Sequence, residues 1–464
     1  YTLASRGEQE WLACLLPRTD KKIKKQGGGA MQQNRADRTS AVRTVALAAL
    51  TLLGSTAGHT AGFALIEQSV PDMGTAYAGS AASDDSVGTL YFNPAGMTRL
   101  SGTRVGAAVH LIEPKTEFKN GDTTFSSDIP PFLSGGSPIS GGDGGDAGGL
   151  AGVPHFYLTH QFDDKTWFGL AVNAPFGLTT EYKSDWVGRY HAIKSEVKTV
   201  NINPSVGYKL NDQVSLAVGV SAMYLDGEFT NAVDFGLLNL PLPGNPLAGW
   251  AAPGVGPGGA DGKSKIEGDS WGWGVNVGAL FVVAEDTRIG MHYRSEVEQN
   301  IEGDVEFTLP DPGLAAAFPD SDVKADIDLP ATFSISGFHQ INRQWAVVGD
   351  YTWTGWSSIP ELRFRFDSAL PDGVTTFDWK DTSRVALGTI YKPDSSDWIY
   401  RVGAAYDESP IKDAETRSAR LPDVDRIWVT VGAGYRPSDD LRIDFGYAHL
   451  FMNDAKISKT ATAG

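Results

Sequence analysis

The sequence predicts an all-β protein, a transmembrane antiparallel up-and-down β-barrel with an N-terminal hatch plugging its lumen. Three observations lead to this fold class. The chain after residue 101 alternates between apolar and small or polar residues, and every second connection is very short. No run of about 18 strongly apolar residues is present to form a membrane helix.

The composition limits the partners. The chain has 464 residues, with 39 Lys and Arg against 56 Asp and Glu and a formal net charge of -17. Because phosphate recognition needs a basic surface, we expect no nucleic-acid partner. The one cysteine, Cys14, excludes a disulfide framework and a cysteine-built zinc site. We expect no cofactor and no metal.

The first 61 residues are expected to lie outside the mature protein. Residues 31–61 have the pattern of a secretory signal peptide, in which three arginines precede the apolar stretch 45–53 and small residues follow it. A short buried helix is the alternative. Because Met31 begins this pattern, residues 1–30 are predicted to be a non-native upstream extension.

Period-two alternation predicts thirteen strands in a barrel that spans 101–464. Val218 and Val220, for example, fall on one face of a strand, and Gly219 and Ser221 fall on the other. The predicted strands are 103–112, 152–162, 166–177, 195–210, 213–227, 270–284, 287–300, 331–341, 344–356, 381–392, 397–407, 426–436 and 440–450.

Short turns and long loops alternate along the chain, which is typical of outer-membrane barrels, whereas a soluble sandwich remains the alternative. Because bacterial single-chain barrels have an even number of strands, we expect fourteen, with the last one missing from this chain. The other possibility is that one strand has been merged or split. The predicted long loops are 113–151, 228–269, 301–330 and 357–380.

The segment 62–100 precedes the first strand, lacks period two and is rich in Gly, Ala and Ser. A barrel of about fourteen strands encloses a lumen wide enough to leak unless it is filled. We therefore expect this segment to be the hatch, and a periplasmic tail is the alternative. Small inward residues leave room for it, such as Gly272, Gly274, Gly432 and Gly434.

Several stretches resemble the FadL/TodX-type outer-membrane transporters of long-chain fatty acids and aromatic hydrocarbons. They include AGFALIEQS, MGTAYAGSAA and YFNPAGM near the N-terminus, PFGLTTEY at 175–182, WKDTSRVALGTIY at 379–391 and RLPDVDRIWVTVGAGY at 420–435. The resemblance covers the chain from about residue 61 to its end. It implies a fourteen-stranded barrel with a hatch, in which a ligand binds among the outer loops, passes to a lumen pocket and leaves sideways through the wall.

Two motifs of that family fall on residues of this chain. The Asn-Pro-Ala signature of the hatch falls on Asn93, Pro94 and Ala95, where an ordinary turn is the alternative. The kink of the third strand, which implies the lateral opening, falls on Pro175, Phe176 and Gly177. Pro and Gly are both unfavourable inside a strand and mark bulges, although a simple strand end would also explain them.

Basic residues that face the lumen are candidates to bind a ligand carboxylate. Period two points Arg384, Arg401 and Arg442 inward, and Lys380 stands at a strand entrance. The alternative is that they pair with lumen or hatch acids such as Asp444. In that case a neutral hydrophobic ligand is favoured.

The loop 228–269 contains an apolar stretch that is a candidate for the first ligand groove or for a helix that dips into the lipid surface. Its residues are Phe235, Leu237, Leu238 and Leu240, and a merely packed loop is the alternative.

No nucleophile elbow, Walker loop or His-Glu-x-x-His motif is present. We therefore expect no enzymatic activity. The resemblance implies a channel of the bacterial outer membrane for passive uptake of hydrophobic compounds, which we expect to be monomeric and in contact with lipid and lipopolysaccharide. A general porin for polar solutes is the alternative, and an outer-membrane hydrolase is a more remote one.

Overall fold

The computed structural model describes the backbone of 8–15 and 18–19 and the residues 62–127, 129, 134–241, 245, 247–251 and 255–459. The predicted signal peptide, 31–61, lies outside the described residues, and the assignment of 1–30 to an upstream extension stays a prediction. In the described part of the chain, no helix is long and apolar enough to cross a membrane.

Antiparallel strands make up most of the molecule. They are β1 (Glu8–Leu15), β2 (Arg18–Thr19), β3 (Thr103–Glu113), β4 (Ala151–Gln161), β5 (Thr166–Asn173), β6 (Gly177–Glu181), β7 (Lys194–Lys209), β8 (Val214–Asp234), β9 (Asp261–Ala284), β10 (Thr287–Arg294), β11 (Val297–Thr308), β12 (Ser321–Leu329), β13 (Thr332–Gln340), β14 (Trp345–Thr354), β15 (Glu361–Phe366), β16 (Gly373–Thr376), β17 (Thr382–Tyr391), β18 (Trp398–Asp407), β19 (Arg426–Ser438) and β20 (Leu441–Met452).

The described helices are all short. They are α2 (Val70–Met73), η1 (Ser80–Ala82), α3 (Thr89–Phe92), η2 (Pro94–Arg99), α4 (Phe235–Leu238), η4 (Pro312–Leu314) and η5 (Trp356–Ser358).

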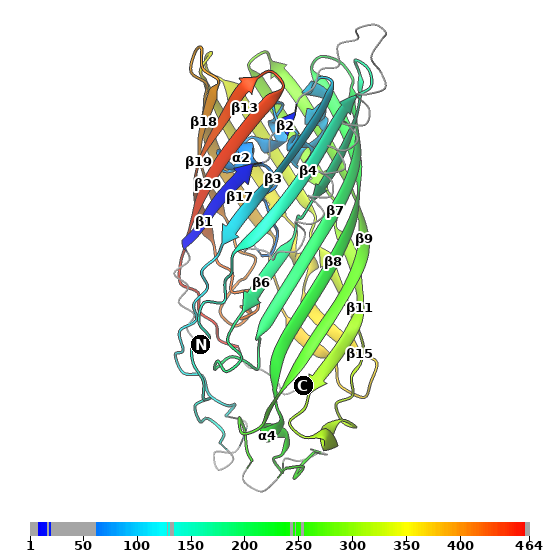
Figure 1. Cartoon of the computed structure of the whole chain (residues 1–464), viewed down its shortest axis with the longest axis vertical. Coiled ribbons are helices and arrows are strands. Elements are labelled where there is room, and N and C mark those ends of the chain that lie inside the picture. Colours follow the sequence, from blue (N-terminus) through cyan, green and yellow to red (C-terminus); the bar gives the residue numbers. More distant parts are fainter. Residues whose placement is uncertain are drawn as a thin grey trace, which may run out of the picture.

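The strands form the wall of a barrel whose short turns lie at one end and whose long loops lie at the other (Figure 1). From β3 onward the wall runs β3, β4, β5, β7, β8, β9, β10, β13, β14, β17, β18, β19 and β20, and each strand is antiparallel to the next. These thirteen strands match the predicted ones in number and order, although the predicted strand 287–300 combined β10 with the start of β11. β1 lies between β20 and β3 and pairs with both, where an up-and-down barrel places the neighbour of its first strand.

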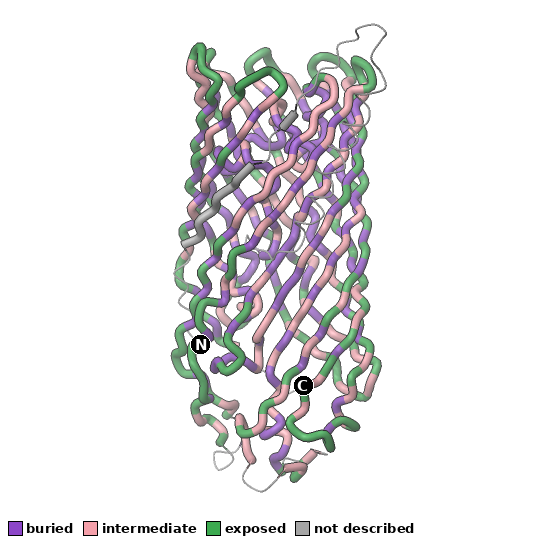
Figure 2. Tube along the Cα trace, in the orientation of Figure 1, coloured by how far each residue is buried: buried purple, intermediate pink, exposed green. Residues whose placement is uncertain are grey.

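The polarity of the wall is reversed relative to a soluble protein. Large apolar side chains on the outer face are exposed, such as Val218 at 53% and Trp273 at 69% of their surface. Polar side chains such as Ser215 and Ser221 are buried on the inner face, and the alternation is visible along the strands in Figure 2. A soluble sandwich would bury its apolar face, so the exposed apolar belt identifies a membrane barrel.

A cation placed on this belt should destabilise the barrel. Leu387 lies in the middle of β17 and is 68% exposed. We expect Leu387→Arg to lower the free energy of unfolding by about 2–4 kcal/mol, because a charge at bilayer depth loses its hydration. Urea unfolding in lipid bilayers measures the change, with Leu387→Val as the apolar control. An unchanged unfolding midpoint would contradict a lipid-facing position.

The long loops contain more strand than the sequence predicted. β8 and β9 continue beyond the predicted limits as one long hairpin, β11 pairs with β12, and β15 pairs with β16. The face of β9 that carries exposed Trp271 carries Glu267 and Asp269 farther out. Alternation with an apolar outer face therefore ends there, because the outer face of the hairpin leaves the lipid for water.

The segment 62–100, the expected hatch, packs inside the barrel, and most of its residues are buried. Inward glycines of the wall admit it. A Cβ at Gly432 would approach the Gly74 Cα to 2.7 Å, and one at Gly290 would approach the Ala81 carbonyl oxygen to 1.8 Å. Gly272 instead faces Val297 of the neighbouring hairpin, so its small size accommodates the wall and not the hatch.

Candidate ligand-binding site

An apolar cavity of about 480 Å³ lies inside the barrel, on the long-loop side of the hatch. Residues of β7, β8, β9, β11, β12 and β15 line it, all from the inner face except Glu267, namely Val197, Leu225, Gly227, Phe229, Ile266, Glu267, Gly268, Ile301, Val323, Ala325, Ile327, Leu362 and Phe364.

The local sequence explains why this cavity is apolar. On β8, Leu225, Gly227 and Phe229 point inward, and the charged residues Asp226 and Glu228 alternate with them. The strand thus exchanges the polarity of its two faces where it leaves the lipid. The hatch contacts β8 nearer the short-turn end, where Thr98 donates to the Ser215 hydroxyl at 2.7 Å, so the cavity stays unfilled.

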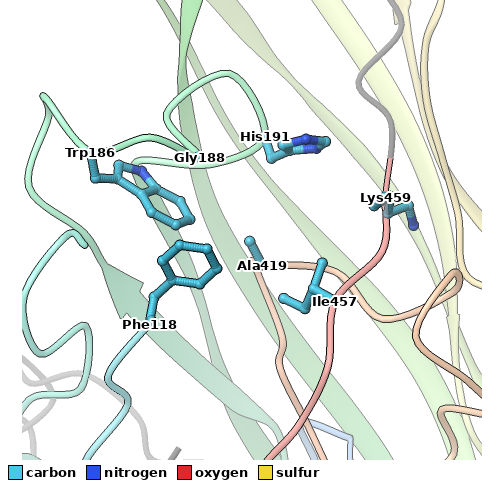
Figure 3. Close-up of a pocket in the computed structure, with 7 residues that line it drawn as sticks. All are labelled: Phe118, Trp186, Gly188, His191, Ala419, Ile457 and Lys459. Atoms are coloured by element: carbon cyan, nitrogen blue, oxygen red, sulfur yellow. The ribbon is translucent and has the colours of Figure 1, made fainter. Parts of the chain in front are cut away.

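A second, smaller apolar pocket of about 240 Å³ lies among the loops (Figure 3). The rings of Phe118 and Trp186 meet edge to face with centroids 5.2 Å apart, and Tyr182 stacks on Trp186 at 4.0 Å. Four segments far apart in the sequence contribute to the lining, which comprises Phe118, Trp186, Gly188, His191, Ala419, Ile457 and Lys459.

Arg420, which the sequence analysis did not single out, lies between the two cavities. Its neighbour Ala419 lines the smaller pocket, and its guanidinium lies over the ring of Phe229, which lines the larger cavity, at 5.5 Å. The guanidinium donates to the Ser195 hydroxyl at 3.0 Å and to the Asn231 side-chain oxygen at 3.3 Å. Burial lowers the pKa of Arg420 to about 10, so the side chain remains cationic at neutral pH.

The third strand is broken at the predicted kink. β5 and β6 both pair with β7, but four steps from Asn173 to Gly177 oppose three steps on β7, which is the signature of a bulge. The hydroxyl of Thr199 on β7 bridges the break, since it accepts from the Phe176 N–H at 3.0 Å and donates to the Phe176 carbonyl at 2.7 Å.

The freed backbone groups at the kink bind the hatch. Leu65 N–H donates to the Pro175 carbonyl at 2.7 Å, and Gly177 N–H donates to the Phe63 carbonyl at 2.8 Å. A short antiparallel bridge thereby joins the start of the hatch to the kink. Pro175 and Gly177 thus lie at a break in the wall, and their role in a lateral opening stays a prediction.

The ladder between β4 and the third strand ends at this break. β4 pairs with β5 only from Phe156 to Gln161, whereas residues 151–155 of β4 pair with β3 alone. Within the described residues, the β6 ladder runs only to β7. The wall therefore lacks strand pairing between the first part of β4 and β6.

An aromatic cluster lies beside the break on the inside. Phe63 packs against Phe176 at a centroid distance of 5.7 Å and against Trp356 at 5.2 Å. These three rings belong to the same apolar cluster as Val197 and Leu225, which line the larger cavity. Apolar side chains thus connect the cavity continuously with the wall break.

Asn93 fastens the hatch to the wall. Its side-chain amide donates to the Ala81 carbonyl at 2.7 Å and to the Ala279 carbonyl of β9 at 2.9 Å, and its oxygen caps η2 by accepting from Ala95 N–H. Pro94 opens η2, where no N–H is needed. Sequence reasoning placed the turn here but not the contact with β9.

The three arginines that were predicted to point inward are buried, but two of them already form ion pairs with carboxylates of the protein. Arg442 contacts Asp444 at 2.7 Å and the hatch residue Asp85 at 3.2 Å, and Arg401 contacts Asp444 at 3.3 Å. This is the alternative that the sequence left open. Arg384 donates to the Ala76 carbonyl of the hatch at 2.8 Å, and Lys380 is exposed at the strand entrance.

The predicted outer groove is a packed cluster. Phe235 and Leu240 are buried, Leu237 and Leu238 are partly exposed, and Phe235 packs against Leu314 of the neighbouring loop. Neither of the two cavities includes these four side chains. A role in first ligand contact stays a prediction for them.

Comparisons with known proteins agree on one family. The family described as outer membrane protein transport protein (OMPP1/FadL/TodX) matches residues 51–464. The long-chain fatty acid transport protein of Escherichia coli O6:H1 is 30% identical over 433 residues, which are 89% of this chain and 92% of that protein. Outer membrane protein P1 of Haemophilus influenzae strain Rd is 30% identical over 440 residues, with 90% and 92% covered.

Two solved structures have the same fold. A Pseudomonas aeruginosa FadL homologue matches with a TM-score of 0.77 and 24% identity, covering 87% of this chain and 94% of that one. The Pseudomonas putida toluene transporter TodX matches with a TM-score of 0.56 and 15% identity, covering 84% and 100%.

Proposed function

Because this chain belongs to the outer membrane protein transport protein family (OMPP1/FadL/TodX), we propose that it takes up long-chain fatty acids or related lipophilic molecules through the bacterial outer membrane without an energy source. One relative is named for long-chain fatty acid transport and a structural neighbour for toluene transport, so both ligand classes occur among similar proteins.

The observation that carries the proposal is the apolar cavity of about 480 Å³ on the long-loop side of a filled lumen. A water-filled pore offers no affinity to a hydrophobic molecule, whereas this cavity removes apolar surface from water at about 25 cal/mol per Å². The smaller pocket at Trp186 is the proposed first contact. The ligand then moves inward to the larger cavity.

The proposed exit is the wall break between β4 and β6. The hatch blocks the lumen on the short-turn side of the cavity, and the Phe63 and Phe176 rings separate the cavity from the break. Movement of the start of the hatch away from Pro175 and Gly177 would open a sideways path into the membrane. A ligand released there never crosses the aqueous periplasm.

A filled lumen argues against the porin alternative, and the relatives are named as transport or outer membrane proteins and not as hydrolases. We propose a monomeric, non-enzymatic channel without a cofactor, surrounded by lipid and lipopolysaccharide.

Filling the larger cavity should abolish ligand binding there. A Cβ at Gly227 meets its nearest heavy atom, on Phe229, at 3.4 Å, an ordinary contact, so the wall tolerates a side chain. We expect Gly227→Leu to weaken binding of oleic acid at least about tenfold, because its side chain occupies the ligand volume. Equilibrium binding to purified protein measures this, with Gly227→Ala as the small control. Equal affinities of wild type and Gly227→Leu would place the ligand elsewhere.

A further inference from the structure

The two apolar cavities share one charged boundary. Ala419 lines the smaller pocket, and the next residue, Arg420, reaches the inner face of β7 and β8. There it contacts Ser195, which is directly opposite Phe229 in the ladder. The next inward pair along the two strands, Val197 opposite Gly227, lines the larger cavity. The guanidinium thus lies at the end of that cavity.

Arg420 has only neutral partners among the described residues, namely the Lys194 carbonyl, the Ser195 hydroxyl and the Asn231 amide oxygen. The nearby carboxylate of Glu196 is already paired with Lys194 and Lys198. A partly buried guanidinium without a carboxylate loses hydration and gains no ion pair in return. An anion bound beside it would supply the missing charge.

Other arginines of the lumen differ from Arg420 in their partners, which are carboxylates or backbone carbonyls of the hatch. Arg426 is paired with Asp423, and Arg442 with Asp444. Arg294 and Arg384 have neutral partners too, but each donates to a carbonyl of the hatch, Tyr91 and Ala76 respectively, and so fastens it. Among these five arginines, Arg420 alone lies next to a lining residue of each cavity, since it follows Ala419 in the chain and lies over the ring of Phe229.

A second cation stands on the outer side of this boundary. Lys459 lines the smaller pocket and donates to the Thr376 carbonyl at 3.0 Å, and Asp413 is the acid that acts on it. Burial, together with the charges of Arg420 and Lys459, lowers the pKa of His191 to about 4, so this histidine is neutral at pH 7. The positive charge of the boundary therefore resides on Arg420 and Lys459.

We propose that Arg420 is a headgroup site shared by both cavities and selects an anionic amphiphile, a long-chain monocarboxylate, over neutral hydrocarbons. The carboxylate stays on Arg420 while the tail moves from the pocket at Trp186 to the cavity at Val197. The headgroup thus never has to cross apolar surface unpaired. This inference rests on the proposed function, because it names the ligand class of the same cavities.

The test compares oleic acid with oleyl alcohol, which share a tail and differ in headgroup charge. We expect the wild type to bind the acid more tightly. Arg420→Gln should lose about tenfold to hundredfold in affinity for the acid and less than about twofold for the alcohol, whereas Arg420→Lys keeps most of the preference. Arg365→Gln is the matched control, because it removes an exposed cation that pairs with Asp326 on the face of β15 opposite the cavity-lining Phe364.

Equal acid affinity in folded Arg420→Gln and wild type would overturn the headgroup site and leave uptake of hydrophobic molecules standing. An equal loss for acid and alcohol would overturn it as well, because it would show that Arg420 only supports the loops. A wild type that binds neither molecule would instead refute the proposed function. Heat-modifiable migration of each purified barrel in electrophoresis verifies that it is folded.

Discussion

A Gly290→Leu variant is expected to conduct ions at least about ten times better than the wild type, because the new side chain occupies the place of the hatch. A Cβ at this inward position of β10 would lie 1.8 Å from the Ala81 carbonyl oxygen and 2.7 Å from the Ala82 nitrogen. Both contacts are with backbone, which cannot rotate aside as a long side chain can.

Displacement of Ala81 would remove several hatch contacts together. The Ala81 carbonyl accepts from Asn93, its N–H donates to the Ser336 hydroxyl at 3.1 Å, and Arg288 pairs with Asp84 close by at 2.9 Å. Each buried polar group left without a partner costs about 1–3 kcal/mol. The hatch should therefore leave this side of the wall and open the lumen to water.

Single-channel recording in planar bilayers measures the conductance. Gly337→Leu is the matched control, because Gly337 is the ladder partner of Ile289 on the adjacent strand and its added Cβ would have no heavy atom within 4 Å. A Gly290→Leu barrel as tight as the wild type would show that the hatch is held by contacts other than these. A wild type with steady high conductance would favour a porin.

The wall was predictable from the sequence because a membrane strand has two solvents, lipid outside and hatch or water inside. Val218 faces the lipid and Ser221 faces the lumen, and the alternation of apolar and polar residues shows this in the sequence. The same rule failed beyond the membrane. On the outer part of β9, Glu267 replaces Trp271 on the outward face. The sequence therefore predicted loops where these strands lie, and it did not predict the cavity that they enclose.

The site residues were predictable only where backbone chemistry is unusual. Pro175 and Gly177 mark the wall break by themselves, because both are unfavourable in a ladder. Period two also gave the inward direction of Arg401 and Arg442, but not their partner Asp85, which comes from the aperiodic hatch. Arg420 follows no period and lies in a loop. Only the fold brings it to Ser195 and Phe229.

Locking the start of the hatch to the kink should abolish uptake. Ala64 and Phe176 are partners in an antiparallel bridge, and the flanking hydrogen bonds, Leu65 to Pro175 and Gly177 to Phe63, make them a non-hydrogen-bonded pair. Cα atoms in such pairs are about 4.5 Å apart, within reach of a disulfide. The chain has one cysteine, Cys14, so a Cys14→Ser background leaves Ala64→Cys and Phe176→Cys as the two thiols.

Oxidation of this double variant is expected to reduce uptake of labelled oleic acid by cells to background, while purified oxidised protein still binds oleic acid in the cavity at Val197. Reduction should restore uptake, which separates the lock from the loss of the Phe176 ring. A disulfide between Ile289→Cys and Gly337→Cys, ladder partners on the outer face of the continuous wall, is the control and should leave uptake unchanged.

The disulfide distinguishes two candidate exit routes, because each route requires a different part of the hatch to move. A sideways exit at the break needs the bridge between Ala64 and Phe176 to open. A path along the lumen axis needs the hatch to leave at Asn93 and Ala81, whose wall contacts are on β9 and β13 and not at the crosslink. Uptake that persists in the oxidised protein would therefore refute the lateral opening. Uptake that stops and returns on reduction would place the moving part at the first residues of the hatch.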